Sequence, residues 1–84
     1  MRIRTDDVAW QEIDGELVVL DLRTSAYLTT NRAGAVLAQR LREEQSLEAL
    51  AAALVDEFDI DRATAVADAE AFVDSLRELS LLTE

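Results

Sequence analysis

The stretch SAYLTTNRAG, residues 25–34, changes from a strand pattern to a helix start within ten residues. Its first part suits a pleated strand and consists of Ala26, Tyr27, Leu28, Thr29 and Thr30, and the following Asn31 is a good helix N-cap. In a chain of 84 residues this strand is expected at a sheet edge. It has neither charge nor Pro, the usual means of protecting an edge. The stretch therefore predicts an open edge that a guest strand can join.

Two further strands are predicted upstream of this stretch. Asp14-Gly15 lies between apolar runs and indicates a hairpin, because both positions of a type I′ turn need positive φ. The first strand falls within residues 6–13 and contains Trp10. In the second strand, ELVVLDL at 16–22, the wholly apolar set Val18, Leu20 and Leu22 is expected to face the core. The three strands would form an antiparallel meander.

Three helices are predicted after Asn31, with apolar residues at helical spacing. The first helix has the stripe Ala33, Val36, Leu37 and Leu41, with Gly34 permitting close packing. The second is capped by Ser46 and has the stripe Leu47, Leu50, Ala51, Leu54 and Phe58. The third runs from the cap Asp61 to about Leu79, with the stripe Ala65, Ala69, Phe72, Leu76 and Leu79. The order is βββααα, a single α+β domain over residues 1–84.

Composition excludes several classes of function. The chain has no Cys and no His, so thiolate nucleophiles and ordinary zinc sites are ruled out, and we predict a non-enzyme without cofactor or metal. The net charge of −10, with eight Arg and no Lys, opposes binding to nucleic acid. No apolar run approaches the roughly 20 residues of a membrane span, and the first residues lack the apolar core of a signal peptide. We therefore expect a cytoplasmic protein with no membrane partner.

The segments DGELVVLDLRTSAYLTTNRAGAVL (14–37), SLEALAAALVDEFDID (46–61) and DAEAFVDSLRELSLL (68–82), after a Trp-bearing strand, resemble the PqqD-like family. These domains are also called RiPP recognition elements, after the ribosomally made, modified peptides they serve. The resemblance implies a winged-helix-like fold and a function in binding the leader region of a precursor peptide. The leader would add as a strand beside the third strand, in a groove against the third helix.

Several residues match the family pattern. Tyr27 matches an aromatic of the third strand, Asp68 and Phe72 match an Asp and a Phe of the third helix, and Leu76 matches a later Leu. Three positions depart from it, because Thr30 replaces a usual Leu, Leu37 replaces a frequent Trp, and Ser80 replaces a usual Gly. The first departure would alter the shape of the groove.

The side chains of the third helix also indicate a groove, independently of the family resemblance. Ala65 and Ala69 are small and would leave space, Phe72, Val73 and Leu76 would form a floor, and acidic residues such as Asp68 would attract Arg or Lys of a guest. Core positions for Phe72 and Leu76, and a solvated acidic face, are the structural alternatives. The predicted peptide site comprises Ala26, Tyr27, Leu28, Thr29, Thr30, Ala65, Asp68, Ala69, Phe72, Val73 and Leu76.

The resemblance leaves the biological setting open. A small separate chain resembles those of lasso-peptide pathways, with a leader peptidase and a cyclase as partners and no catalysis of its own. A PqqD-type chaperone of the precursor of a quinone cofactor is the alternative. The edge strand would also suit a strand-paired dimerisation module, so the expected state is a monomer or a weak dimer.

Overall fold

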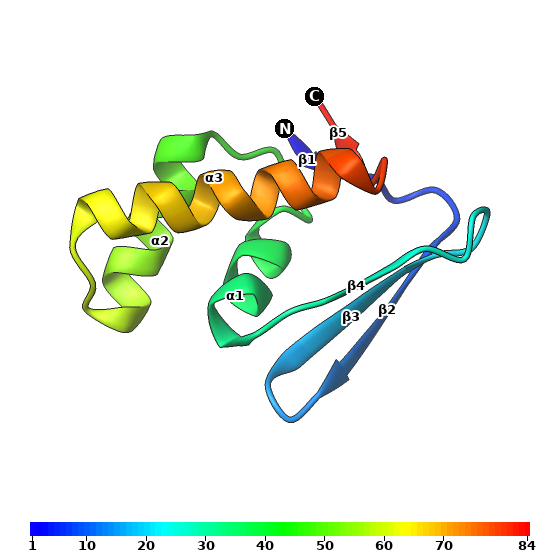
Figure 1. Cartoon of the computed structure of the whole chain (residues 1–84), viewed down its shortest axis with the longest axis horizontal. Coiled ribbons are helices and arrows are strands. Elements are labelled where there is room, and N and C mark those ends of the chain that lie inside the picture. The colour runs from blue at the N-terminus through cyan, green and yellow to red at the C-terminus, as the bar shows by residue number, and fades with distance from the viewer.

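The computed structural model describes residues 1–84 and consists of a three-stranded sheet, three helices and a short pair of terminal strands (Figure 1). The elements in chain order are β1 (Arg2–Ile3), β2 (Val8–Ile13), β3 (Glu16–Asp21), β4 (Tyr27–Thr29), α1 (Arg32–Arg40), α2 (Leu47–Phe58), α3 (Arg62–Glu78) and β5 (Leu82–Thr83). The predicted α+β class and the order of the three main strands and three helices are confirmed. No helix is both long and apolar enough to cross a membrane.

The main sheet is an antiparallel meander in the order β2-β3-β4. The hairpin turn between β2 and β3 is the one predicted, with positive φ at Asp14 (54°) and Gly15 (82°). Trp10 pairs with Val19 and Val19 pairs with Leu28, so these three side chains share the face that packs on the core. The guanidinium of Arg42 lies 4.3 Å from the centre of the Trp10 ring and covers it.

The predicted core face of the second strand is wrong. Leu17, Val19 and Asp21 are buried, at 2%, 0% and 1% exposure, whereas Leu22 is 58% exposed. Both faces of this strand carry apolar residues, so their pattern alone did not choose between them. Asp21 can lie on the inner face because it accepts hydrogen bonds from Arg4 (2.6 Å) and from the Arg23 N–H (2.9 Å).

The three predicted N-caps are confirmed. Asn31, Ser46 and Asp61 each accept a hydrogen bond from the backbone N–H three residues later, at 2.8, 3.1 and 2.7 Å. The end of α2 differs from the prediction, because Phe58 is 37% exposed where the helix gives way to Asp59 in the left-handed conformation. Ser80 follows α3 with φ of 57°, a conformation that favours Gly and explains why Gly is usual at this position.

The pairing between the two chain ends was not predicted. β1 and β5 form their own antiparallel pair, and Leu81 beside them is fully buried. The Ile3 N–H also donates to the Leu41 carbonyl (2.8 Å), which ties the N-terminal strand to the end of α1. The two chain ends thus pair beside the C-terminal end of α3 and do not join the main sheet (Figure 1).

Candidate functional site

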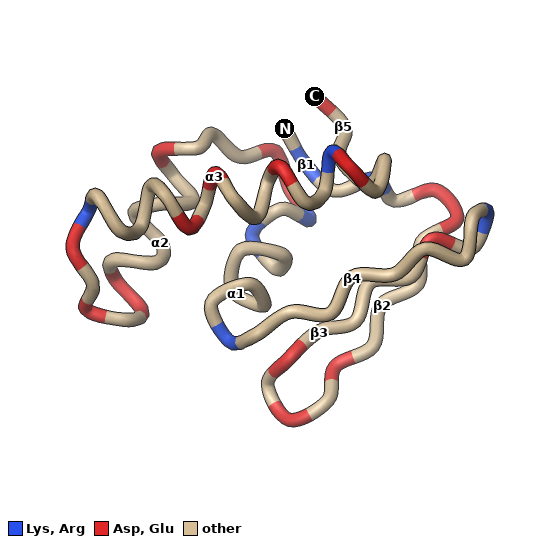
Figure 2. The backbone as a smooth tube through the Cα atoms, in the orientation of Figure 1, with Lys and Arg blue, Asp and Glu red and all other residues tan.

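The main sheet has two edge strands, β2 and β4, and β4 is the edge predicted to receive a guest strand. Thr29 and Tyr27 of β4 lie opposite Val18 and Leu20 of β3. The Thr30 N–H bonds to the Leu17 carbonyl and the Ala26 carbonyl accepts from Asp21, so these flanking groups point toward β3. Backbone groups alternate in direction along a strand, and those of Tyr27 and Thr29 therefore point away from the sheet. The predicted open edge is present, and no charged residue lies on β4 (Figure 2).

The five predicted strand residues fall into two groups. Tyr27 and Thr29 are exposed, Tyr27 by 64%, and lie on the outer face of the sheet. Leu28 is half-buried and packs on the core, and Ala26 is half-buried at the start of the strand. Thr30 is 7% exposed, and its Oγ1 accepts a hydrogen bond from the Leu17 N–H at 2.9 Å. A guest strand would therefore meet the backbone of this edge and only some of its side chains.

Asp21 anchors the turn that leads into β4. Besides its bonds to Arg4 and Arg23, its backbone carbonyl accepts from the Ser25 N–H at 2.8 Å. The hydrogen bond from the Arg23 N–H lowers the pKa of the Asp21 carboxyl, and the positive charge and hydrogen bond of Arg4 add to this against the opposing effect of burial. Arg4 also donates to the Ser80 carbonyl (3.3 Å), so the Arg4–Asp21 ion pair joins this turn to the residue that follows α3.

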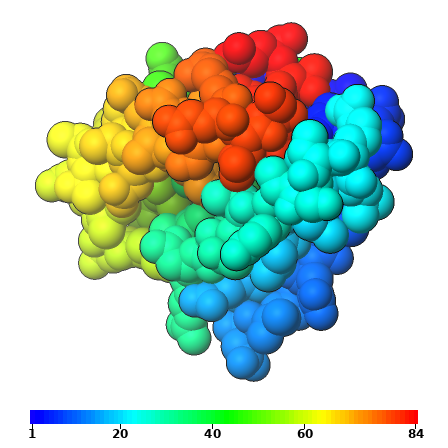
Figure 3. All heavy atoms as spheres, turned by 45° about the vertical axis from the view of Figure 1, so that its right-hand side comes forward, coloured from blue at the N-terminus to red at the C-terminus, as the bar shows by residue number.

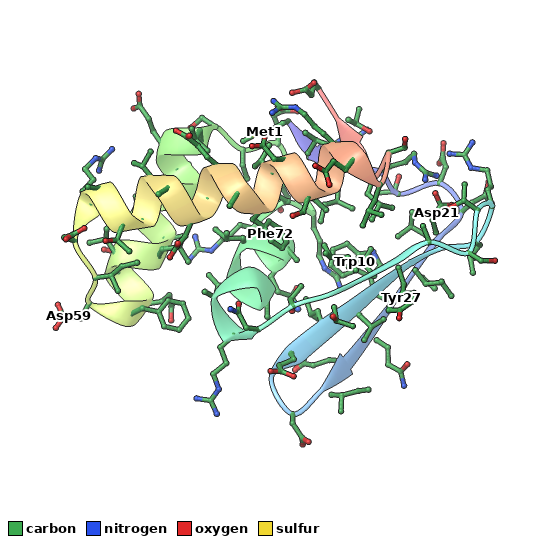
Figure 4. The ribbon with its side chains drawn as sticks, viewed as in Figure 1. Met1, Trp10, Asp21, Tyr27, Asp59 and Phe72 are labelled. Atoms are coloured by element: carbon green, nitrogen blue, oxygen red, sulfur yellow. The ribbon has the colours of Figure 1, made fainter.

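A pocket of about 260 Å³ lies just beyond the end of β4, between α1 and α3. The wall on the α3 side consists of four residues spaced as one helical stripe (i, i+3, i+4, i+7). The wall on the α1 side consists of the N-cap and the first two turns of that helix. Its lining residues are Asn31, Ala33, Gly34, Leu37, Asp68, Ala71, Phe72 and Ser75. The Phe72 ring points from α3 toward α1 (Figure 4), and in the space-filling view the cyan atoms around β4 meet the orange atoms of α3 (Figure 3). The lining of the pocket starts at Asn31, two residues after the end of β4, so the pocket adjoins the open edge and we treat the two as one candidate site.

The structure divides the predicted α3 residues between this site and the core. Asp68 and Phe72 line the pocket. Ala65, Ala69 and Leu76 have no exposed surface and Val73 is 3% exposed, so their side chains lie beneath α3 and support the groove without lining it. The alternative reading of Leu76 as core applies in the structure, whereas Phe72 packs against the core and also faces the pocket.

The sequence prediction missed Ala71 and Ser75, and it treated Asn31 and Gly34 only as a cap and a packing position. The signal for Ala71 and Ser75 was available, because both lie on the same helical stripe as Asp68 and Phe72. The contribution of α1 depends on how α1 and α3 cross, which no local pattern contains.

A larger hollow of about 590 Å³ lies on the other side of α1, between the β2–β3 hairpin and the end of α2. Its lining combines apolar residues such as Val36 and Phe58 with charges of both signs, including Arg32, Arg40 and Glu57. None of the predicted site residues lines this hollow. It is therefore separate from the edge of β4, although one of its lining residues, Arg32, directly follows Asn31.

Comparison with known proteins gives matches that cover nearly the whole chain. The family described as Coenzyme PQQ synthesis protein D (PqqD) matches residues 16–82. A solved structure of TbiB1 in complex with the TbiA(beta) leader peptide is 32% identical with a TM-score of 0.85, covering 98% of this chain and 94% of that one. A lasso peptide synthetase B1 complexed with its leader peptide is 30% identical with a TM-score of 0.82, covering 99% and 96%. No match was found among the curated proteins.

The family match includes β3, β4 and all three helices, and therefore every element that builds the candidate site. The two solved structures share the fold over essentially their full length, at identities of 30% or more. The resemblance inferred from the strand, the third-helix pattern and their order is confirmed. This chain belongs to the PqqD family.

Proposed function

We propose that this chain binds the leader region of a ribosomally made precursor peptide by strand addition to β4. The observation that carries the proposal is the unused backbone of Tyr27 and Thr29 at an uncharged edge, beside a pocket against α3. The two similar structures, TbiB1 and lasso peptide synthetase B1, were both solved with a leader peptide bound. Strand addition uses backbone bonds for affinity and alternate side chains for specificity, which matches an edge lying next to a pocket.

The backbone bonds alone would not select one leader. Each contributes about 0.5–1.5 kcal/mol net, and every extended peptide offers the same groups. The pocket beside Phe72 would supply discrimination by taking a side chain of the guest. Asp68 at the pocket is exposed, and it would favour a guest that carries Arg or Lys nearby.

The outer face of the sheet supports a role in presenting the bound leader to other proteins. A shallow hollow of about 330 Å³ on this face is lined by Ala9, Trp10, Gln11, Val18, Leu20 and Tyr27. Ile13 and Leu22 are exposed by 51% and 58%, and no helix covers this side. A guest strand on β4 would extend this apolar face, so a maturation enzyme could contact chain and leader together. We propose a leader peptidase and a cyclase as these enzymes, aided by the raised local concentration of tethered substrate.

Calorimetric titration with the TbiA(beta) leader peptide tests the proposal, with the leader peptide of the similar lasso peptide synthetase B1 complex as a second probe. We expect affinity in the nanomolar to micromolar range for the leader alone, without the core peptide. In hydrogen-exchange measurements the amides of Tyr27 and Thr29 should become protected on binding, because they gain carbonyl partners. Absence of binding to both leaders would overturn the proposal, and a stable dimer that ignores them would indicate a strand-paired dimerisation module.

The quinone-cofactor setting differs in the precursor and not in the mode of binding. The description of the matched family favours it, whereas both similar solved structures belong to leader-binding proteins of the B1 type. Competition between a lasso leader and the precursor of the quinone cofactor for this chain would distinguish the two. We expect the lasso leader to bind at least tenfold more tightly.

A further inference from the structure

The first turn of α1 contains a glycine at a position where the helix itself does not need one. Gly34 is buried, and its N–H donates to the Asn31 cap at 2.8 Å. Its φ lies outside the left-handed region, since Gly15 is the only glycine with positive φ. Glycine is a poor helix former, so backbone conformation gives no reason for it here. The reason is space.

A Cβ on Gly34 would lie 3.0 Å from the Cβ of Thr30 and 3.2 Å from Cε1 of Phe72. Both distances are shorter than ordinary van der Waals contact, so each neighbour would have to give way by a few tenths of an ångström. Thr30 is held by two hydrogen bonds to Leu17, each of 2.9 Å, one through its N–H and one through its Oγ1. Phe72 has only packing contacts and is half-buried. Its ring is therefore freer to shift than Thr30, whose contact with the added Cβ does not depend on the position of the ring.

The ring can move away from α1 only by entering the pocket beside it. Phe72 and Gly34 both line this pocket, together with Ala71 and Ser75 on α3. At about 260 Å³ it is smaller than the 300–1,000 Å³ typical of small-molecule sites, and its size suits one inserted side chain. The absence of a Cβ at residue 34 thus holds the ring of Phe72 back and keeps the pocket wide.

We propose that Gly34 is a specificity-determining residue, which sets the width of the pocket and so selects a leader that inserts a bulky apolar side chain there. This inference rests on the proposed function, because the guest of the pocket is a leader residue. Apolar walls from Ala33, Leu37 and Ala71 favour such a side chain over a charged one. Gly34 acts by positioning Phe72.

An alanine scan of the TbiA(beta) leader peptide, titrated against the wild-type chain and G34A, tests the proposal. Wild type should lose at least tenfold in affinity when the inserted leader residue is truncated. G34A should bind the intact leader at least tenfold more weakly than wild type does. Truncation of the inserted leader residue should then lower the affinity of G34A by less than a further threefold. Parallel scan profiles for the two proteins would overturn the proposal.

Two controls separate this role from a structural one. Q39A changes an exposed residue of the same helix outside the pocket and should reproduce the wild-type scan. F72L shortens the displaced ring but leaves the Thr30 contact in place, so the loss of affinity caused by G34A should be at least threefold smaller in the F72L background than in wild type. An equal loss in the two backgrounds would contradict the proposal. If G34A alone does not fold, F72L and G34A/F72L are compared with leaders enlarged at the inserted position. F72L should tolerate them better, and identical behaviour of the two would overturn the proposal. A wild-type chain that binds no leader would instead refute the proposed function.

Discussion

Two faces of α3 differ in what they do, and they are separated by about 100° of rotation about the helix axis. The inner face carries Ala65, Ala69, Val73 and Leu76, all within 3% of complete burial. The face toward β4 and α1 carries Asp68, Ala71, Phe72 and Ser75, which line the pocket. One helix thus supplies both core and candidate binding wall, through stripes offset by about one residue. Substitutions two residues apart should therefore affect different properties.

The largest effect is expected from an acid on the inner face. In A69D a carboxylate would replace a fully buried methyl group, with no cation or donor around it in the apolar core. An unpaired buried charge costs several kcal/mol, a large part of the stability of a small domain. We expect loss of the native circular-dichroism spectrum or a melting temperature lowered by more than 15 °C. Near-native stability would show that α3 is packed differently.

Aspartate at Ala71, two residues after Ala69, should weaken leader binding and leave the fold intact. Ala71 is exposed and lines the pocket, so A71D should cost less than about 1 kcal/mol in stability, mainly through helix propensity. Its carboxylate would have to lose water when a leader side chain enters, and leader affinity should fall at least tenfold in calorimetry. A67D is the matched control, because Ala67 is exposed on α3 and lines no pocket. Equal affinities for A71D and A67D would place the leader elsewhere.

A smaller effect on binding is expected at the open edge. T29P removes an N–H that points away from β3, while leaving the ladder bonds of Leu28 and Thr30 in place. The loss of one backbone bond to the guest should weaken leader binding by about twofold to tenfold. T29V keeps the N–H and serves as control. If T29P bound as tightly as T29V, strand addition at β4 would be contradicted.

The smallest effect concerns the pair that anchors the turn before β4. Since the folded-state pKa of Asp21 lies below its ordinary value of about 3.9, its contribution to stability is present above that pH and lost as the pH falls through the folded pKa. D21N should therefore melt at a lower temperature than wild type at pH 7, and the difference should shrink below about pH 4. Melting curves between pH 7 and pH 2 measure this. A difference independent of pH would exclude the carboxylate as its source.

The candidate site could be predicted in part. Its edge strand followed from the uncharged residues of β4, and Asp68 and Phe72 followed from the third-helix pattern. Of the predicted floor, Phe72 lines the pocket, whereas Val73 and Leu76 lie in the core. Ala65 and Ala69 were expected to leave space and are also buried in the core, because a small side chain indicates either space or tight packing. Gly34 shows the same ambiguity, since its missing Cβ serves a contact with Phe72, which is distant in sequence.

The sequence by itself determined the elements of this protein. Turns, caps and apolar periods are local features, so the hairpin at Asp14, the caps of all three helices and the change from strand to helix at Asn31 could be read in order. Only the tertiary structure decided which face of β3 is buried, which stripe of α3 lines the pocket, and that β1 pairs with β5. These features depend on how separate elements pack against one another. β3 has apolar residues on both faces and α3 has them around much of its circumference, so the local pattern does not decide which side is buried.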